Sequence, residues 1–199
     1  GRKLVHHMFD DAYNPAKPKA GVKELQEGVG IFAWVGGVGT APGLAVKDYL
    51  MERGVPWVGP STGAENWITP PSKHLFAVYP LYSIEAKALA RYAVMTQGLK
   101  KIAIIYQNDD YGKDGVRGAE AELARHGLKL VEQVPVNPAD GDLKPHVMSL
   151  KKSGAEAVLL WTTPKHAVMT VGTAKAMQFA PQFLSTSTCS DFPLMMHIS

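Results

Sequence analysis

The sequence predicts an α/β protein with two doubly wound, Rossmann-like lobes, on two observations. Short apolar runs alternate with helix-length amphipathic segments along most of the 199 residues, which is typical of strand–helix–strand units. A proline-rich segment, Gly59–Pro80, interrupts this alternation and contains no helix-length pattern. We therefore expect a first lobe over residues 1–80 and a second over residues 81–199.

Residues 101–134 carry the clearest strand–helix–strand pattern. Ile102–Tyr106 is a continuous apolar run, as expected of a parallel strand buried on both faces. A polar turn follows, then a helix over Lys113–His126 with apolar residues at helical spacing, and then a strand over Leu128–Val134. Ligands of open α/β sheets bind outside the carboxyl ends of the strands. We therefore expect Tyr111, in the polar turn, to be partly exposed and to contact a ligand, so that Tyr111→Ala weakens binding without harming the fold.

The remaining elements follow from the same periodicities. We expect strands at Lys3–Phe9, Ile31–Val35, Val55–Val58, Ala157–Trp161 and Gln182–Leu184, and helices at residues 16–27, Pro42–Arg53, Ser83–Gln97, Asp142–Ser153 and Pro164–Met177. In the Ser83–Gln97 helix, Ala88, Tyr92 and Met95 form the amphipathic pattern. The first lobe then has few strands for a sheet, so we expect the chain to be truncated at both ends.

Composition narrows the function classes. Charged residues make up 20% and apolar residues 46% of the chain, as in folded globular proteins. The net charge of +3 is small and the lysines are scattered, which argues against nucleic-acid binding. The single cysteine, Cys189, excludes an internal disulfide and fits a reducing compartment or the periplasm equally. No apolar run reaches the ~18 residues of a membrane span, and no signal peptide is visible.

Three motifs resemble catalytic or cofactor-binding signatures without completing them. Residues 37–43 (GVGTAPG) have Pro42 where a dinucleotide-binding loop needs its third glycine, and no acid follows the next strand. Residues 59–63 (GPSTG) match G-x-S-x-G, but Pro70 and Pro71 prevent the long helix that a nucleophile elbow needs. None of the seven histidines has H-x-x-x-H spacing. We therefore expect no catalytic residue, no cofactor and no metal, with Ser61 a loop hydroxyl.

Several stretches, in their order and spacing, resemble the periplasmic solute-binding proteins of ABC transporters of the leucine/isoleucine/valine type, the type I periplasmic binding proteins. They are Leu4–Pro15, Phe32–Thr40, Val55–Gly63, Phe76–Pro80, Lys101–Gly115 and Leu150–Trp161. The resemblance implies two lobes joined by a hinge that close on a small ligand. It further implies a non-enzymatic receptor in the periplasm or outside the cell, with a membrane permease as partner and no nucleic acid. From the resemblance we also expect this chain to lack the opening strand and helix of lobe 1 and the last third of a family member.

The resemblance also implies the ligand-binding residues. They are Val38, Gly39, Thr40, Ser61, Thr62 and Gly63 in lobe 1, and Tyr111, Thr162 and Ser187 in lobe 2. The amino-acid binders have a serine or similar hydroxyl where this chain has Val38-Gly39, and Gly39 leaves room for a bulkier ligand group. The amino-acid binders also have an acid in lobe 2 that binds the ammonium group of the ligand. This chain has Ser187 at that position, and Asp191 is the expected substitute for the acid. The expected ligand is a branched-chain or other amino acid, or a small organic or aromatic acid.

Two other functions stay open. A type I ligand-sensing domain of a signalling or regulatory protein has the same fold and the same kind of site. An enzyme of the doubly wound class would need a nucleophile–base pair or a cofactor loop, and neither is found in the sequence.

Overall fold

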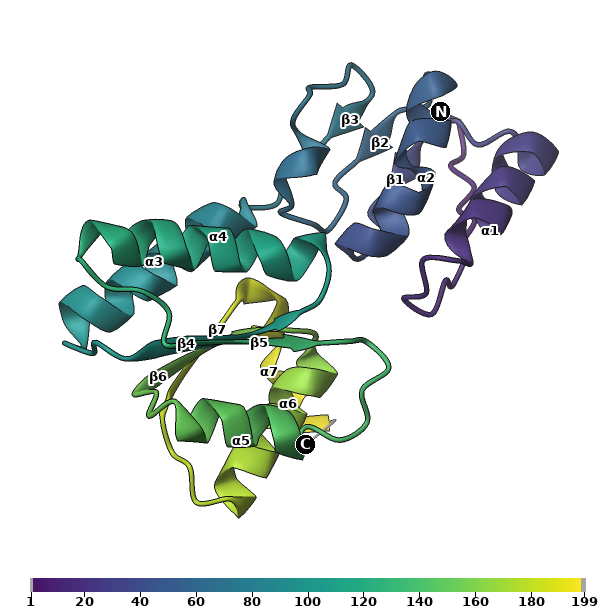
Figure 1. The fold of residues 1–199 in the computed structure, drawn as a ribbon. Coiled ribbons are helices and arrows are strands. Elements are labelled where there is room, and N and C mark those ends of the chain that lie inside the picture. The colour runs from purple at the N-terminus through teal and green to yellow at the C-terminus, as the bar shows by residue number, and fades with distance from the viewer. Residues whose placement is uncertain (1, 198–199) are drawn as a thin grey trace. The chain divides into compact units, whose positions relative to one another are not determined.

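A computed structural model describes residues 2–197 of the chain. The chain forms two compact units, residues 1–81 and 82–199. Each unit has a sheet in which every strand pairs in parallel with its neighbours. The predicted α/β class with parallel sheets is therefore confirmed (Figure 1).

Unit 1 has a small sheet of three two-residue strands in the order β1-β2-β3. Its elements are α1 (Pro18–Glu24), a π-helical turn (Leu25–Val29), β1 (Trp34–Val35), α2 (Thr40–Glu52), β2 (Trp57–Val58), a 3-10 turn (Glu65–Trp67) and β3 (Leu75–Phe76). Strand β3 was not expected from the sequence, because its apolar pair lies within the proline-rich segment. Parallel pairing with β2 forms it.

Two tryptophans hold α2 against this sheet. The rings of Trp57 and Trp67 meet edge to face, with centroids 4.9 Å apart. A β-carbon at Gly43 would lie 2.5 Å from Trp67 Cζ2, so only glycine lets the first turns of α2 approach so closely. Leu50, at the other end of α2, is fully buried. This packing fixes the start of α2 relative to the loops that follow β1 and β2.

The predicted strand at Lys3–Phe9 is wrong. Residues 3–9 have neither helical nor strand structure, and all their side chains are exposed, with Leu4 completely so. A strand needs a neighbour to satisfy its backbone hydrogen bonds, and no described strand pairs with this segment. Alternating apolar residues alone do not form a strand.

Unit 2 has four parallel strands in the order β5-β4-β6-β7. The strands are β4 (Ile102–Gln107), β5 (Glu132–Val136), β6 (Ala157–Trp161) and β7 (Gln182–Ser185). The helices are α3 (Tyr82–Arg91) with a π-helical turn (Tyr92–Thr96), α4 (Asp110–Arg125), α5 (Lys144–Lys152), α6 (Pro164–Ala176), a 3-10 turn (Ser187–Cys189) and α7 (Phe192–His197). Helices α3 and α4 lie over one face of the sheet, and α5 and α6 over the other (Figure 1).

The central strands explain this layering. Every residue of β6 is buried, as is nearly all of β4, which requires helices on both faces. Helix α4 approaches the sheet through Gly115, where a β-carbon would lie 2.5 Å from the Trp161 ring. It approaches α3 through Gly118, where a β-carbon would overlap the Ser83 backbone. Small residues therefore bring α3, α4 and the sheet into close contact.

The buried face of α3 differs from the one that the sequence pattern indicates. Ala88, Tyr92 and Met95 are exposed, and the buried positions are Tyr82, Ser83, Ala86, Ala90 and Ala93. The neighbouring helix presents glycine at the contact, so α3 packs through its alanines. The larger apolar side chains are left on the surface.

Candidate functional site

In unit 1, the predicted residues lie together at the carboxyl ends of β1 and β2. Val38 and Ser61 form a parallel β-bridge beyond the two strands. The Gly39 N–H donates to the Ser61 carbonyl (3.2 Å), and the Ser61 N–H donates to the Gly37 carbonyl (2.8 Å). These bonds place the loop before α2 directly beside the loop that contains Ser61, Thr62 and Gly63.

Buried threonine hydroxyls tie the same two loops together. Thr40 Oγ1 lies 2.7 Å from Thr62 Oγ1, and both side chains are almost completely buried. Thr62 Oγ1 also accepts a hydrogen bond from the Ala64 N–H (3.3 Å). The hydroxyls of Thr40 and Thr62 therefore position the loops. The side chains that face solvent at this edge are those of Ser61 and Val38.

The start of α2 adds an electropositive feature to this edge. Gly39 is the N-cap residue and has no side chain that could accept from the first-turn N–H groups. The first N–H groups of a helix have no partner within the helix, and the helix dipole makes this end favourable for an anion. The unit-1 edge therefore combines one free helix start with the hydroxyl of Ser61.

Tyr13 lies over the same edge and was not identified from the sequence. A β-carbon built on Gly39, whose φ is +101°, would overlap the Tyr13 ring and lie 3.0 Å from its Cζ. Tyr13 has a positive φ of 55°, as does Ala12 at 52°. The Asp11 carboxylate accepts from the Tyr13 N–H (2.7 Å) and holds this turn. The space next to Gly39 that was expected for a bulkier ligand group is thus occupied by Tyr13.

In unit 2, the three predicted residues follow β4, β6 and β7 and lie at the carboxyl edge of the sheet. The Tyr111 hydroxyl donates to the Thr162 carbonyl (3.2 Å) and lies 2.9 Å from the Thr188 hydroxyl. Cys189 Sγ also donates to the Thr162 carbonyl, at 3.5 Å. Ser187 belongs to the 3-10 turn that contains Thr188 and Cys189. Tyr111 thereby connects the loops after three strands.

The expectation that Tyr111 is partly exposed is wrong. Its side chain is only 3% exposed, and its ring packs against Tyr82, with centroids 4.7 Å apart. Asp109 is the N-cap and accepts from the Gly112 N–H (3.2 Å), so α4 begins at Asp110 rather than at Lys113. Tyr111 is therefore in the first helical turn and is directed into the core. Burial raises its pKa well above the usual 10.0, so its hydroxyl stays neutral.

Glu85 is a second residue that sequence reasoning missed. It lies in the first turn of α3 and accepts hydrogen bonds from both the N–H and the hydroxyl of Ser187, the latter at 3.1 Å. An acid in a first helical turn is common, so the local sequence gives no sign of this long-range partner. The proposed substitute acid, Asp191, instead accepts from the Leu194 N–H (3.1 Å) at the start of α7. The acid that contacts Ser187 is Glu85.

Metal-ligating clusters and membrane-spanning helices are both absent from residues 2–197. No group of three or more His, Cys, Asp or Glu side chains is arranged so that it could hold a metal ion. Among these residues there is also no helix with the length and apolarity that crossing a membrane requires.

Comparison with known proteins places this geometry in a family. Residues 1–194 match the periplasmic binding protein family. The chain belongs to this family. The resemblance inferred from the sequence is therefore confirmed, and this family is non-enzymatic.

Individual relatives of this periplasmic binding protein support the family assignment. It is 31% identical over 160 residues to Leu/Ile/Val-binding protein homolog 3 of Brucella melitensis, a match that covers 79% of this chain and 43% of the relative. A substrate-binding periplasmic protein of Ralstonia solanacearum has a TM-score of 0.82 at 26% identity, over 90% of this chain and 50% of that one.

A possible leucine/isoleucine/valine-binding protein of Rhodopirellula baltica has a TM-score of 0.83 at 25% identity, over 91% of this chain and 50% of that one. The chain spans about half the length of the relatives that it matches.

Proposed function

We propose that this chain is part of a solute receptor that binds a small carboxylate-bearing ligand and delivers it to the membrane permease of an ABC importer. The proposed ligand is a branched-chain or other amino acid, or a small organic or aromatic acid, and the proposed location is the periplasm or the cell exterior. The observation that carries the proposal is the Val38–Ser61 bridge, which brings a free hydroxyl beside the uncapped start of α2.

The unit-1 edge has the chemistry that a carboxylate needs. The helix start offers N–H groups and a favourable dipole, and the Ser61 hydroxyl is exposed and able to donate. Val38 and the Tyr13 ring are the apolar groups beside it. An anion with an adjacent apolar portion therefore fits this edge better than a sugar, whose many hydroxyls would need more polar partners.

Among the proposed carboxylate ligands, the unit-2 edge favours an amino acid. An ammonium group needs a negative partner, and the half-buried Glu85 carboxylate lies at Ser187, one of the residues implied by the family resemblance. The names of the Brucella and Rhodopirellula relatives refer to leucine, isoleucine and valine. We therefore favour a branched-chain amino acid as the ligand.

Titration calorimetry on the full-length natural protein tests this function. Leucine, isoleucine, valine and benzoate are compared with leucinamide and leucinol, which lack the carboxylate. We expect at least one carboxylate to bind with a stoichiometry of one and its carboxylate-free analogue to bind at least ~10-fold more weakly, a difference of about 1.4 kcal/mol. Equal affinity for the analogue, or no binding of any carboxylate, would contradict the proposal.

Two matched variants locate the site. Ser61→Ala removes an exposed hydroxyl and should weaken binding of the carboxylate ligand by ~3- to 10-fold, the contribution of one hydrogen bond. Ser149→Ala, a similar change on α5, is the control and should leave affinity unchanged. With the ligand identified, its uptake into vesicles that contain the permease should depend on the receptor.

A further inference from the structure

Helix α3 and the turn that continues it expose an apolar stripe. Ile84, Ala88, Tyr92 and Met95 lie four, four and three residues apart, and thus on one helical face. Ile84 is 58% exposed, Tyr92 is 42% exposed and Met95 is 67% exposed. These four residues are called the α3 stripe below. Contiguous apolar side chains of this kind on a surface are typical of an interaction site.

The stripe is not needed to hold α3 in place. The opposite face of the helix packs on α4 through small residues, and Ala86, Ala90 and Ala93 are fully buried there. The contact with α4 is so close that a β-carbon at Gly118 would lie 2.9 Å from Ala86 Cβ. Helix α3 thus has one apolar face that the core uses and a second that it leaves uncovered.

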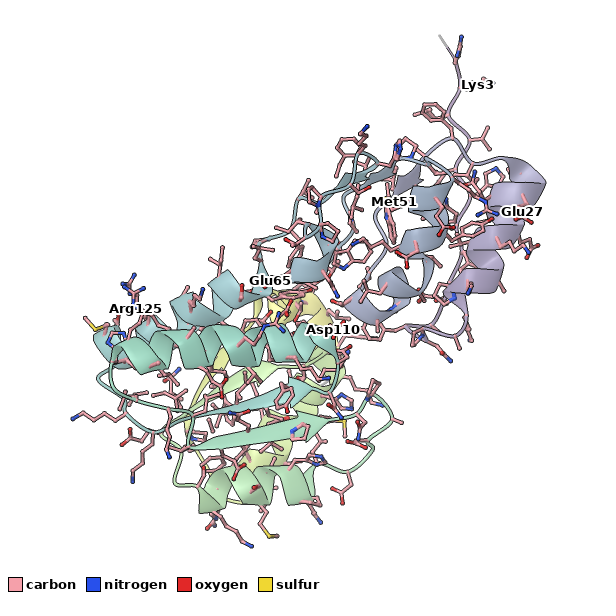
Figure 2. The ribbon with its side chains drawn as sticks, turned by 45° about the horizontal axis from the view of Figure 1, so that its top comes forward. Lys3, Glu27, Met51, Glu65, Asp110 and Arg125 are labelled. Carbon is pink, nitrogen blue, oxygen red and sulfur yellow. The ribbon has the colours of Figure 1, made fainter. Side chains whose placement is uncertain are left out.

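A groove of about 450 Å³ runs along this second face. Its apolar lining comes from Ile84, Ala88 and Tyr92, and its polar lining includes Lys87, Arg91 and Arg125. Figure 2 shows Asp110 at one end of α4 and Arg125 at the other. The surface therefore combines a hollowed apolar strip with three cationic side chains.

One buried acid holds two of these cations in position. Glu122 on α4 is almost fully buried and pairs with Arg91 Nε (3.2 Å) and with Arg125 Nη1 (3.7 Å). His126 Nε2 lies 3.3 Å from the same carboxylate. One carboxylate cannot neutralise Lys87, Arg91 and Arg125 together, so the groove has a net positive charge at neutral pH.

We propose that the α3 stripe and its groove dock an acidic amphipathic helix of a partner protein. Apolar side chains of that helix enter the groove against Ile84 and Tyr92, and its carboxylates pair with Lys87, Arg91 and Arg125. This is the helix-in-groove mode of recognition, with complementary charge supplying orientation and a faster encounter.

Charge and shape disfavour the other occupants. A second copy that paired through the same face would bring Lys87, Arg91 and Arg125 of both copies into one interface, where the concentration of like charge is unfavourable. An anionic membrane would match the charge, but a bilayer surface has no side chains with which to fill a groove. The groove therefore favours a protein partner.

The test uses the full-length natural protein and a fluorescein-labelled synthetic helical peptide. The peptide carries leucines along one face and glutamates on both flanks, and a second peptide replaces every glutamate with lysine. Fluorescence anisotropy should show saturable binding of the glutamate peptide that weakens at least tenfold from 50 to 500 mM salt, and no binding of the lysine peptide. Equal binding of both peptides, or of neither, would overturn the proposal.

Variants place the binding on the stripe. Ile84→Ser and Lys87→Glu should each weaken binding of the glutamate peptide at least tenfold. Met148→Ser and Lys144→Glu make the same kinds of change on exposed positions of α5 and should leave it unchanged. All four residues are exposed, so circular dichroism should find the variants folded. Loss of peptide binding in the α5 variants as well would contradict the assignment.

Three outcomes would each show that something other than a partner helix occupies the α3 stripe, and each would overturn the inference. One is protection of a thiol introduced by Met95→Cys from maleimide, since a covered stripe means that the protein's own chain occupies it. Another is self-association that Ile84→Ser abolishes in analytical ultracentrifugation. The last is displacement of the glutamate peptide by vesicles of phosphatidylglycerol. Rapid maleimide labelling of the introduced thiol, a monomeric protein in ultracentrifugation and no displacement of the glutamate peptide by vesicles would support the partner helix.

Discussion

The ring of Tyr13 occupies the space that a β-carbon would need at Gly39. The two residues lie 26 positions apart, and each has a backbone conformation that most residues avoid, with φ of 55° and 101°. The contact sets the position of the loop before α2, which the proposed carboxylate site uses. Strained backbone is often found where a site requires one particular arrangement.

Gly39→Ala should destabilise the protein by ~1–3 kcal/mol, because the new β-carbon overlaps the Tyr13 ring and alanine is strained at this φ. Urea unfolding followed by tryptophan fluorescence measures the change. In a Tyr13→Ala background the steric part of the cost should disappear. An equal cost in both backgrounds would mean that the two residues do not interact.

Gly172→Ala is the matched control. This glycine lies in α6, is exposed, and a β-carbon there would meet no atom within 4 Å. Alanine has the higher helix propensity, so the substitution should raise stability by ~0.5–1 kcal/mol.

Substitutions of Thr40 and Thr62 should affect the stability of the fold, whereas a substitution of Ser61 should leave stability nearly unchanged. Thr40→Ala and Thr62→Ala remove the two ends of one buried hydrogen bond, and a double-mutant cycle on unfolding should give a coupling energy of ~0.5–1.5 kcal/mol. Ser61→Ala should change unfolding by less than ~0.5 kcal/mol because its side chain is exposed. Additive effects of the two threonine changes would show that the hydroxyls are not coupled.

Tyr111 should behave as a core residue. Tyr111→Phe removes the hydrogen bonds to Thr162 and Thr188 and should cost ~0.5–1.5 kcal/mol of unfolding free energy, whereas Tyr111→Ala should cost ~3–5 kcal/mol. This replaces the expectation, drawn from sequence, of an intact fold after loss of the ring. Tyr106→Phe on β4 is the control, with a cost near zero. A melting temperature of Tyr111→Ala equal to that of the wild type would contradict the observed packing.

Asp109 should give stability a distinct pH dependence. Burial raises the pKa of its carboxyl above the usual 3.8, although hydrogen bonds from Gln107 (2.6 Å) and Gly112 oppose the shift. Between 3.8 and the raised pKa, the folded state therefore binds more protons at this group than the unfolded state, and acidification favours folding. Asp109→Asn keeps an acceptor for the Gly112 N–H and does not titrate.

The wild-type protein should therefore gain stability relative to Asp109→Asn as the pH falls from 7 towards 3.8, as followed by urea unfolding at each pH. Asp109→Ala loses the helix cap and should cost ~0.5–2 kcal/mol at pH 7. A stability difference between wild type and Asp109→Asn that stays constant with pH would contradict the assigned shift.

Elements whose pattern is local were predictable from the sequence. The continuous apolar run Ala157–Trp161 is a strand with the expected bounds, and the helix of Pro164–Met177 ends one residue early. The alternation of strands and helices implied parallel sheets, and the residues implied by the family resemblance do follow strand ends. Such features depend on neighbours in the chain, so the sequence alone can indicate them.

Tertiary structure decided what depends on distant partners. Which face of α3 is buried depends on its close contact with Gly118 of α4, and Lys3–Phe9 is not a strand because no described strand pairs with it. The contacts of Tyr13 with Gly39 and of Glu85 with Ser187 join segments that no local pattern relates. Periodicity reports which residues share a face of an element, whereas packing and hydrogen bonding between distant segments determine what that face meets.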